Sequence, residues 1–327
     1  MKILVVRFSS IGDIVLTTSV LRCLKNQIPN LELHYLTKDK FKSILECNPH
    51  IDKLHTFEHS FAEIKANLKA EKYDYLIDLH HNIRTLRLKS FLGVKSFSFP
   101  KLNIEKWFLV YFKWNKMPQL HVVDRYFEAV KKLGVKNDLK SGEFYLLDSD
   151  YVDLKQVYQI KNYLAFALGA QYATKRLPLH KLIEILEPID FPVVFLGDQN
   201  DALVAEELIA HFPNKPFIQA CGKYSLRQSA SIIEQSQLVL CHDTGLMHIA
   251  ACFKKPIVSV WGNTIPELGM YPYLPKLENL YSIHQVNNLS CRPCSKIGFK
   301  SCPKKHFKCM NLQDSEAISS EIKNRFS

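Results

Sequence analysis

The stretch Cys241-His242-Asp243-Thr244-Gly245-Leu246-Met247-His248-Ile249-Ala250-Ala251 joins a short apolar run at 238–240 to a small, apolar segment with helical spacing. Asp243 and Thr244 therefore lie at a strand-to-helix turn, and both are favourable N-cap residues. A helix start of this kind presents free N–H groups and the positive end of the helix dipole, which together bind phosphate. The stretch predicts an α/β fold with an anion site; the simpler interpretation is a plain capped helix.

Other apolar runs repeat the same arrangement along the chain. Strand, helix, strand in repetition predicts a parallel sheet with helices on both faces, in which ligands bind beyond the carboxyl ends of the strands. The pattern thins between 137 and 157, so we expect domains at 1–150 and 151–312, with a final helix in 313–327. The runs that indicate strands lie at 3–6, 31–36, 75–79, 163–168, 192–196, 238–240 and 257–260.

Composition limits the classes of function. The chain has 327 residues and a formal net charge of +11, which favours anionic partners. Much of the positive charge lies between Arg84 and Lys136, but no DNA- or RNA-binding signature accompanies it, so a phosphorylated lipid or membrane surface is favoured over nucleic acid. The sequence shows no bilayer-spanning stretch or signal peptide, which predicts a cytoplasmic protein able to rest on a membrane. The turn at 9–13 has only Gly12, which argues against a nicotinamide dehydrogenase.

Three motifs resemble one family. Asp-Thr-Gly-Leu-Met-His followed by Ile-Ala-Ala, at 243–251, resembles the signature of glycosyltransferase family 9, the ADP-heptose:lipopolysaccharide heptosyltransferases. The segment 7–13 is similar to the opening pattern of that family, and 169–178 is similar to its Gly-Ala and Lys-Arg-Trp-Pro motif, with Leu177 in place of tryptophan. The resemblance runs over nearly the whole chain.

The resemblance implies the GT-B fold, two doubly wound Rossmann-like domains facing across a cleft, with the last helix packing back on the N-terminal domain. It implies a metal-independent, inverting glycosyltransferase that moves heptose from ADP-heptose to a lipopolysaccharide core or related glycolipid at the inner-membrane surface. The residues themselves identify neither the sugar, nor the base, nor the acceptor. Two other functions stay open: a non-catalytic nucleotide-sugar-binding protein, and a basic module for membranes or nucleic acid.

Two residues match catalytic positions of the family. Asp13 matches the proposed general base, which takes the proton of the acceptor hydroxyl as its oxygen attacks the anomeric carbon. Lys175 matches the lysine that offsets the charge growing on the leaving diphosphate. The simpler interpretations are a helix cap for Asp13 and a loop cation for Lys175.

Further candidates lie at strand ends or in the matched motifs. By resemblance, Asp201 contacts the donor ribose and Tyr224 lines the base pocket, where a tyrosine can stack. The predicted donor-binding residues are Ser9, Gly12, Thr174, Asp201, Tyr224, Asp243, Thr244, Gly245, Leu246, His248 and Gly262. The predicted acceptor-binding residues are His80, His81, Arg84 and Arg125. The first three could equally belong to a solvated polar loop, and Arg125, which opens a later helix, could equally be structural.

Two segments are unusual in composition. The aromatic run at 104–114, bracketed by lysines, favours buried packing, with a membrane-interface helix as the alternative. Of nine cysteines, those at 23, 47, 221, 241 and 252 fall in apolar patterns. The family needs no metal, but a structural zinc is a candidate against free thiols or a disulfide, because the first pair of the remaining cluster has zinc-ligand spacing. That cluster is Cys291, Cys294, Cys302 and Cys309.

Overall fold

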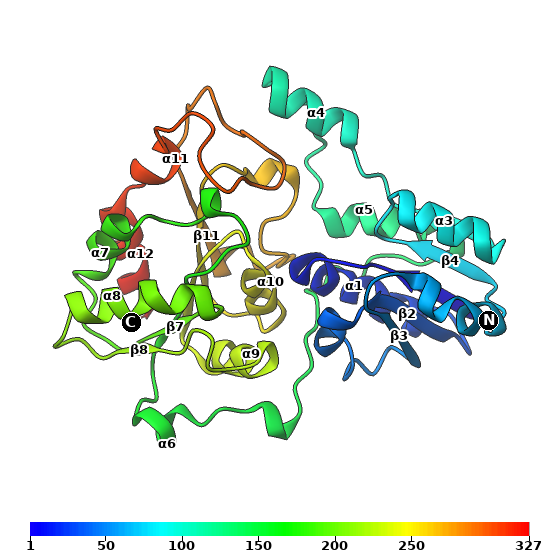
Figure 1. The fold of residues 1–327 in the computed structure, drawn as a ribbon, viewed down its shortest axis with the longest axis horizontal. Helices are drawn as coiled ribbons and strands as arrows, with labels where there is room; N and C mark the ends of the chain where they lie inside the picture. The colour runs from blue at the N-terminus through cyan, green and yellow to red at the C-terminus, as the bar shows by residue number, and fades with distance from the viewer. Residues whose placement is uncertain (327) are drawn as a thin grey trace. The chain divides into compact units, whose positions relative to one another are not determined.

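The computed structural model describes residues 1–326, which divide into two compact units (Figure 1). The N-terminal unit comprises Met1–Leu102 and Leu120–Leu147. The C-terminal unit comprises Asn103–Gln119 and the chain from Asp148 onward. The division therefore lies close to the expected boundary near residue 150, but Asn103–Gln119 groups with the second unit rather than the first.

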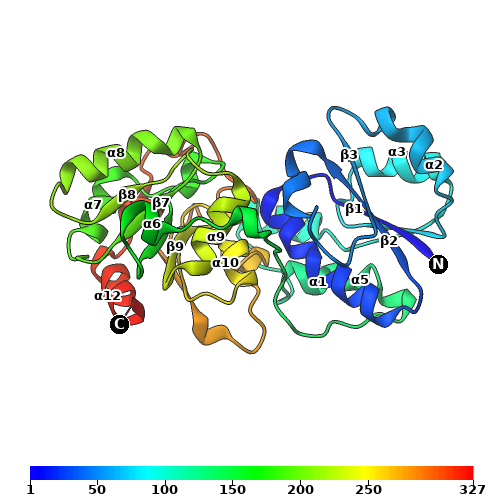
Figure 2. The same ribbon diagram turned by 90° about the horizontal axis from the view of Figure 1, so that it is seen from below.

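The N-terminal unit is built on a parallel sheet. Its elements are β1 Lys2–Val6, α1 Ile11–Gln27, β2 Glu32–Lys38, β3 Lys53–Phe57, α2 Lys65–Ala70, β4 Tyr75–Asp78, α3 Ile83–Leu92, β5 Lys95–Ser98 and α5 Val122–Glu128. The strand order is β3-β2-β1-β4-β5, and every neighbouring pair is parallel. Figure 2 shows α2 and α3 on one face of this sheet and α1 and α5 on the other.

The C-terminal unit is a second parallel sheet, with strand order β11-β10-β9-β6-β7-β8 in the elements given next. Its elements are α4 Asn103–Phe112, α6 Leu154–Tyr158, β6 Leu164–Ala167, α7 Leu179–Leu186, β7 Val193–Leu196, α8 Ala202–His211, β8 Phe217–Gln219, α9 Leu226–Gln235, β9 Leu238–His242, α10 Gly245–Cys252, β10 Ile257–Trp261, β11 Tyr281–Gln285, α11 Lys308–Asn311 and α12 Ser315–Phe326.

The side chains of β6 pack against helices on both faces of the sheet, as in a doubly wound fold. Successive residues of a strand point to opposite faces. Leu164 and Phe166 enter the core that also contains residues of α7, α8 and α12. Ala165 and Ala167 enter the core that contains residues of α9 and α10. Helices thus cover both faces, and the predicted α/β class with two doubly wound Rossmann-like units is confirmed.

Four strands are not predicted by the sequence pattern: β3, β5, β8 and β11. These four are the edges of the two sheets. The short sequences Lys53-Leu54-His55-Thr56-Phe57 and Lys95-Ser96-Phe97-Ser98 mix polar and apolar residues. A central strand is buried on both faces and favours mostly apolar residues, whereas an edge strand tolerates polar residues.

The last helix packs differently from the expectation. We expected it to lie on the N-terminal domain, but α12 belongs to the C-terminal unit and packs on α7. Ile318 and Ile322, which are four residues apart, are fully buried in the same core as the apolar face of α7. The ring of Phe326 stacks on Phe191 with centroids 3.6 Å apart. The amphipathic α7 therefore supplies the apolar surface that α12 covers.

The aromatic helix α4 also departs from the favoured expectation of buried packing. Leu109 is the one buried residue in this helix, all of which is described. Its aromatic side chains are exposed or half-buried instead. Within residues 1–326, no helix combines the length and apolar character needed to cross a bilayer.

Candidate active site

Asp13 lies in the first turn of α1, directly beyond the carboxyl end of β1. Arg7 Nη2 lies 2.6 Å from Asp13 Oδ1. Ser10 donates to Asp13 Oδ2 from its hydroxyl at 2.8 Å and from its backbone N–H at 3.2 Å. The carboxylate is therefore held by two neighbours, while 22% of the side chain stays exposed. It is both oriented and accessible, as a general base must be.

Arg7 is the residue that orients Asp13, and the sequence analysis missed it as a site residue. Its Nε donates to Ser9 O at 2.7 Å and its Nη1 donates to Leu79 O at 2.5 Å. The guanidinium thus ties together the turns that follow β1 and β4. The available signal was a charged residue immediately after the buried strand.

The electrostatics of this turn keep Asp13 ionised. Burial alone would raise the pKa of the Asp13 carboxyl, but the Arg7 charge and the hydrogen bonds from Ser10 outweigh burial and lower that pKa below its ordinary value. A carboxylate with a lowered pKa is a weak base. Such a base takes a proton only from a group that has itself become acidic.

The turn after β4 lies beside Asp13 because β1 and β4 are neighbouring parallel strands. Asp78 is fully buried and shapes this turn. Its Oδ1 accepts hydrogen bonds from the N–H groups of His80 at 3.0 Å and His81 at 2.6 Å. Its Oδ2 lies 2.7 Å from Lys89 Nζ. This buried pair, also missed from sequence, fixes the loop that carries the predicted acceptor residues.

The predicted acceptor residues do not share one environment. His80 is buried with its ring 5.1 Å from that of Phe8, and burial, reinforced by the Arg7 charge, lowers the pKa of His80 to about 3. It is neutral at physiological pH, so it can hydrogen-bond an acceptor but cannot offer it a positive charge. His81 and Arg84 are exposed, and the Arg84 guanidinium lies 5.8 Å from the Phe8 ring centroid.

Arg125 is the most buried of the four predicted acceptor residues. It lies on α5 with 1% of its surface exposed, and burial lowers the pKa of its guanidinium. Ser9 and Gly12, two predicted donor contacts, lie in the turn of Asp13. The Ser9 carbonyl accepts from Arg7, and Gly12 is buried in α1. The structure thus gives Ser9 an internal partner and buries both Arg125 and Gly12.

In the C-terminal unit, Lys175 meets Asp243 beyond the carboxyl ends of β6 and β9, which are neighbours in the sheet. Lys175 Nζ lies 2.5 Å from Asp243 Oδ2 and 3.4 Å from the Asp243 carbonyl oxygen. Thr264, which follows β10, donates its hydroxyl to the same Oδ2 at 2.9 Å. An ammonium has three N–H donors, and Asp243 accepts from two of them, which leaves one for an anionic ligand.

The start of α10 lies directly after Asp243. Thr244 is the N-cap residue, and its side chain makes no capping hydrogen bond to any residue from 1 to 326. The N–H groups of the first turn, which begins with Gly245 and Leu246, therefore lack a side-chain cap. His248, one turn further on, is buried. Asp243 contacts Lys175, and Thr244, Gly245 and Leu246 follow Asp243 at the start of α10; their binding of a donor stays a prediction.

His242 is a further residue that sequence reasoning missed. Its Nε2 accepts a hydrogen bond from the Leu177 N–H at 3.1 Å, which ties the end of β9 to the loop that carries Lys175. Burial lowers the pKa of His242 to about 4, so the ring stays neutral and its Nε2 remains an acceptor. Its position directly before Asp243 was the only sequence signal.

Asp201 points into the protein. Its Oδ2 accepts from the Asp198 N–H at 2.9 Å, and its Oδ1 lies 2.9 Å from Arg176 Nη1. A Cβ atom at Gly169 would lie 2.2 Å from Asp201 Oδ2, and one at Gly197 would lie 2.5 Å from it. The two glycines thus leave room for the buried Asp201 carboxylate. This carboxylate pairs with Arg176, the residue that follows Lys175.

Three other predicted donor contacts also have internal partners. A Cβ atom at Gly262 would lie 2.6 Å from both Thr174 O and Met310 Cε, so packing alone requires a glycine there. Thr174 is buried, and its hydroxyl accepts from the Phe299 N–H at 2.8 Å. Tyr224 is half-buried, with its hydroxyl 3.5 Å from that of Tyr158.

The cysteine cluster holds free thiols, so the alternative of a local disulfide is wrong. Burial raises the pKa of Cys294 to about 11 and that of Cys309 to about 12. Among residues 1–326, the one group with three potential ligand atoms within 4.8 Å is instead His34, His55 and Glu71. Glu71 is already paired there with Lys2 and Lys53. A zinc on the four cysteines stays a prediction.

Comparison with known proteins connects the chain that carries these two strand-end sites to one family. Residues 61–301 match the family model described as glycosyltransferase family 9 (heptosyltransferase). The chain is 25% identical over 291 residues to lipopolysaccharide heptosyltransferase 1 of Campylobacter coli, covering 81% of this chain and 84% of that protein.

Solved structures agree in fold. A glycosyltransferase family 9 protein from Veillonella parvula has a TM-score of 0.72 at 21% identity, over 86% of this chain and 85% of that one. The E. coli ADP-heptose lps heptosyltransferase II has a TM-score of 0.71 at 17% identity, over 99% of this chain and 100% of that one. The family match spans well over half of the sequence, so the chain belongs to glycosyltransferase family 9 and is a glycosyltransferase.

Proposed function

We propose that the protein is an inverting heptosyltransferase that moves heptose from ADP-heptose to a lipopolysaccharide core or related glycolipid, without a metal cofactor. The observation that carries this proposal is the Asp13 carboxylate, ionised and oriented by Arg7 and Ser10 at a strand end. The name of the Campylobacter relative supports heptose as the sugar and lipopolysaccharide as the acceptor class. The name of the E. coli structure supports ADP-heptose as the donor.

Asp13 acts on the acceptor in this proposal. The acceptor hydroxyl oxygen attacks the anomeric carbon of the heptose from the face opposite the diphosphate, which inverts the configuration. As the new C–O bond forms and the bond to the diphosphate breaks, the hydroxyl proton passes to Asp13 Oδ. ADP leaves with the electron pair of the broken bond.

Lys175 acts on the donor. Asp243 holds its ammonium through two hydrogen bonds, and the remaining N–H would bind the diphosphate beside the uncapped start of α10. Its charge then stabilises the negative charge that develops on the leaving group, which lowers the transition state more than the ground state. The acceptor is membrane-borne, so we place the reaction in the cytoplasm at the inner-membrane surface.

Measuring ADP release from purified protein tests the proposal. ADP-heptose with a heptose-accepting core glycolipid should give acceptor-dependent ADP release and a product with inverted anomeric configuration. UDP-glucose and GDP-mannose serve as donor controls and should release no nucleotide. Tight ADP-heptose binding without any turnover would instead favour a non-catalytic nucleotide-sugar-binding protein. Turnover with a different donor and none with ADP-heptose would show that the transferred sugar is not heptose.

A further inference from the structure

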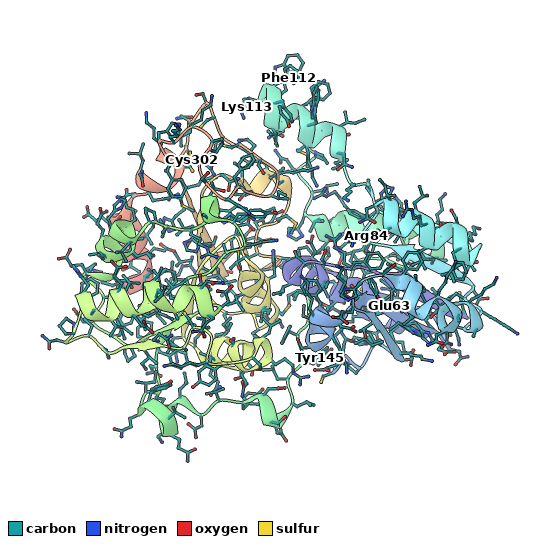
Figure 3. All side chains as sticks on the ribbon, viewed as in Figure 1. Glu63, Arg84, Phe112, Lys113, Tyr145 and Cys302 are labelled. Carbon is teal, nitrogen blue, oxygen red and sulfur yellow. The ribbon has the colours of Figure 1, made fainter. Side chains whose placement is uncertain are left out.

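The helix α4 turns its apolar stripe toward solvent. Ile104, Trp107, Phe108, Tyr111 and Phe112 follow the spacing i, i+3, i+4, i+7, i+8 that normally faces a protein core. Ile104 is 69% exposed, Trp107 49%, Tyr111 70% and Phe112 51%. Figure 3 shows Phe112 projecting from the outer end of the helix. An amphipathic helix with this orientation lacks the partner that its sequence pattern requires.

Four exposed rings and the half-buried ring of Phe108 form one continuous surface, here called the aromatic patch: Trp107, Phe108, Tyr111, Phe112 and Trp114. Trp107 contacts Phe112 at a centroid separation of 5.1 Å, and Tyr111 at 5.6 Å. Phe108 stacks on Trp114 at 6.1 Å with an interplanar angle of 8°. Single exposed apolar residues are ordinary on soluble proteins, but contiguous aromatic surfaces mark binding sites.

The patch is held in place rather than loosely attached. Lys113, directly after α4, donates from Nζ to Pro293 O at 2.7 Å and to Cys291 O at 3.3 Å. The same Nζ donates to Val110 O at 2.7 Å and so closes the end of the helix. Leu109 provides the buried contact on the inner side. The aromatic side chains therefore have a fixed outward presentation.

Charge around the patch identifies the partner. The segment 103–119 contains Lys106, Lys113 and Lys116 and a single acid, Glu105. The Lys116 ammonium lies 5.2 Å from the Phe108 ring centroid and 5.7 Å from that of Trp114, directly beside the rings. Aromatic rings bordered by lysines suit the headgroup region of a bilayer with anionic lipids, where tryptophan and tyrosine are enriched and lysines pair with phosphates.

We propose that α4 lies in the interface of an anionic phospholipid bilayer and docks the protein on the membrane. Ten helical residues span about 15 Å, half of a bilayer's hydrocarbon thickness, so the helix rests in the surface and does not cross it. The proposal goes beyond sugar transfer by naming the surface that delivers a lipid-linked acceptor, and it does not depend on which sugar is transferred.

Vesicle binding tests the proposal with the full-length protein. The wild type should sediment with vesicles of phosphatidylcholine and phosphatidylglycerol, bind pure phosphatidylcholine more weakly, and release partly at high salt. The variant Trp107→Ser/Tyr111→Ser/Phe112→Ser should lose about tenfold or more in affinity, and Lys116→Gln should lose a few-fold on anionic vesicles only. The matched control Val157→Ser/Leu203→Ser removes two exposed apolar side chains of the same unit, 55% and 73% exposed, and should bind normally.

Intrinsic fluorescence gives a second readout. The protein has three tryptophans; Trp107 and Trp114 belong to the patch, while Trp261 is fully buried. Vesicles should shift the emission to shorter wavelength, and brominated lipids should quench it. Undiminished vesicle binding by the triple variant, or no binding by the wild type, overturns the proposal. A wild-type dimer that the triple variant dissociates would identify a second copy as the partner instead.

Failure here is distinguishable from failure of the proposed function. ADP release with a soluble, delipidated acceptor should be the same for the wild type and the triple variant, because the patch takes no part in the chemistry. Loss of that activity would show that the substitutions damage the fold.

Discussion

The two strand-end sites use the same scaffold with opposite charge. In the N-terminal unit, a buried cation, Arg7, holds a carboxylate, Asp13, that keeps part of its surface exposed. In the C-terminal unit, a buried carboxylate, Asp243, holds a cation, Lys175. In both, the supporting residue and the presented residue come from turns at the carboxyl edge of a parallel sheet. In both units the parallel sheet determines where the site lies. Its chemistry depends on whether the supported side chain is a carboxylate or a cation.

The same comparison explains why an ion pair alone is poor evidence for function. Lys89 and Asp78 form a close pair at the same sheet edge, yet the carboxylate is fully buried and fixes a loop. Asp13 differs because its side chain remains 22% exposed, and Lys175 differs because it lies beside an uncapped helix start. Among the carboxylates, accessibility therefore separates Asp13 from Asp78. The side chains of Lys89 and Lys175 are equally exposed, at 15%, so the helix start beside Lys175 is what distinguishes the two cations.

The largest expected effect comes from removing the presented carboxylate. Asp13→Asn should fold normally and lower kcat by about 10²- to 10⁴-fold, because the amide cannot accept the acceptor proton. ADP release under donor and acceptor saturation measures this, and Asp190→Asn, whose side chain is 91% exposed, is the control. Near-normal kcat in Asp13→Asn would remove this residue from the mechanism.

The next effect comes from removing the presented cation. Lys175→Met should lower kcat/KM by about 10²-fold, because the charge on the leaving diphosphate loses its partner in the transition state. ADP affinity by calorimetry should fall less than kcat/KM does. The exposed Lys161→Met provides a matched charge control in the same unit. Equal losses in ADP affinity and kcat/KM would contradict a role specific to the transition state.

Removing the cation that supports Asp13 should shift the pH profile. In the wild type the pKa of Asp13 is lowered, so the ionised base is lost only at acidic pH. In Arg7→Gln, burial is no longer opposed by the guanidinium, so the pKa of Asp13 should rise and the acid limb of kcat/KM should move to higher pH. The stability that Asp13 contributes is present above its unfolded pKa of about 3.9 and is lost as the pH falls through the lower folded value.

Arg7 is buried, so the measurement needs a folding check. Circular dichroism and thermal unfolding should accompany the profile, with the exposed Arg87→Gln as the control. A folded Arg7→Gln enzyme with an unchanged acid limb would mean that Arg7 does not set the protonation of Asp13.

The smallest expected effect on catalysis comes from disturbing the packing around Asp201, near the Lys175 site. Gly169→Ala places a Cβ atom 2.2 Å from Asp201 Oδ2, which should destabilise the fold by about 1–3 kcal/mol. Chemical denaturation measures the loss, and adding Asp201→Ala should relieve the clash while it also releases Arg176. If Gly169→Ala is as stable as the wild type, the carboxylate does not occupy this glycine-lined space.

Local sequence patterns predicted the site residues whose position depends only on their neighbours in the chain. A few consecutive residues were enough to place Asp13 and Asp243 at strand-to-helix turns, and the family resemblance supplied the role predicted for Asp13. The supporting residues Arg7, Asp78 and His242 could not be identified in this way, because their roles depend on partners that the chain brings together only on folding. His242, for example, acts on Leu177, which lies 65 residues earlier.

The central strands of both sheets followed from sequence, since burial on both faces favours mostly apolar runs. The edge strands did not, because one side of each is free to carry polar residues. Only the tertiary structure decided three further points: that α12 completes the core beside α7, that Asp201 turns inward between two glycines, and that the apolar stripe of α4 faces solvent. An amphipathic pattern specifies that a helix has an apolar face, but the surrounding fold determines whether protein or solvent meets it.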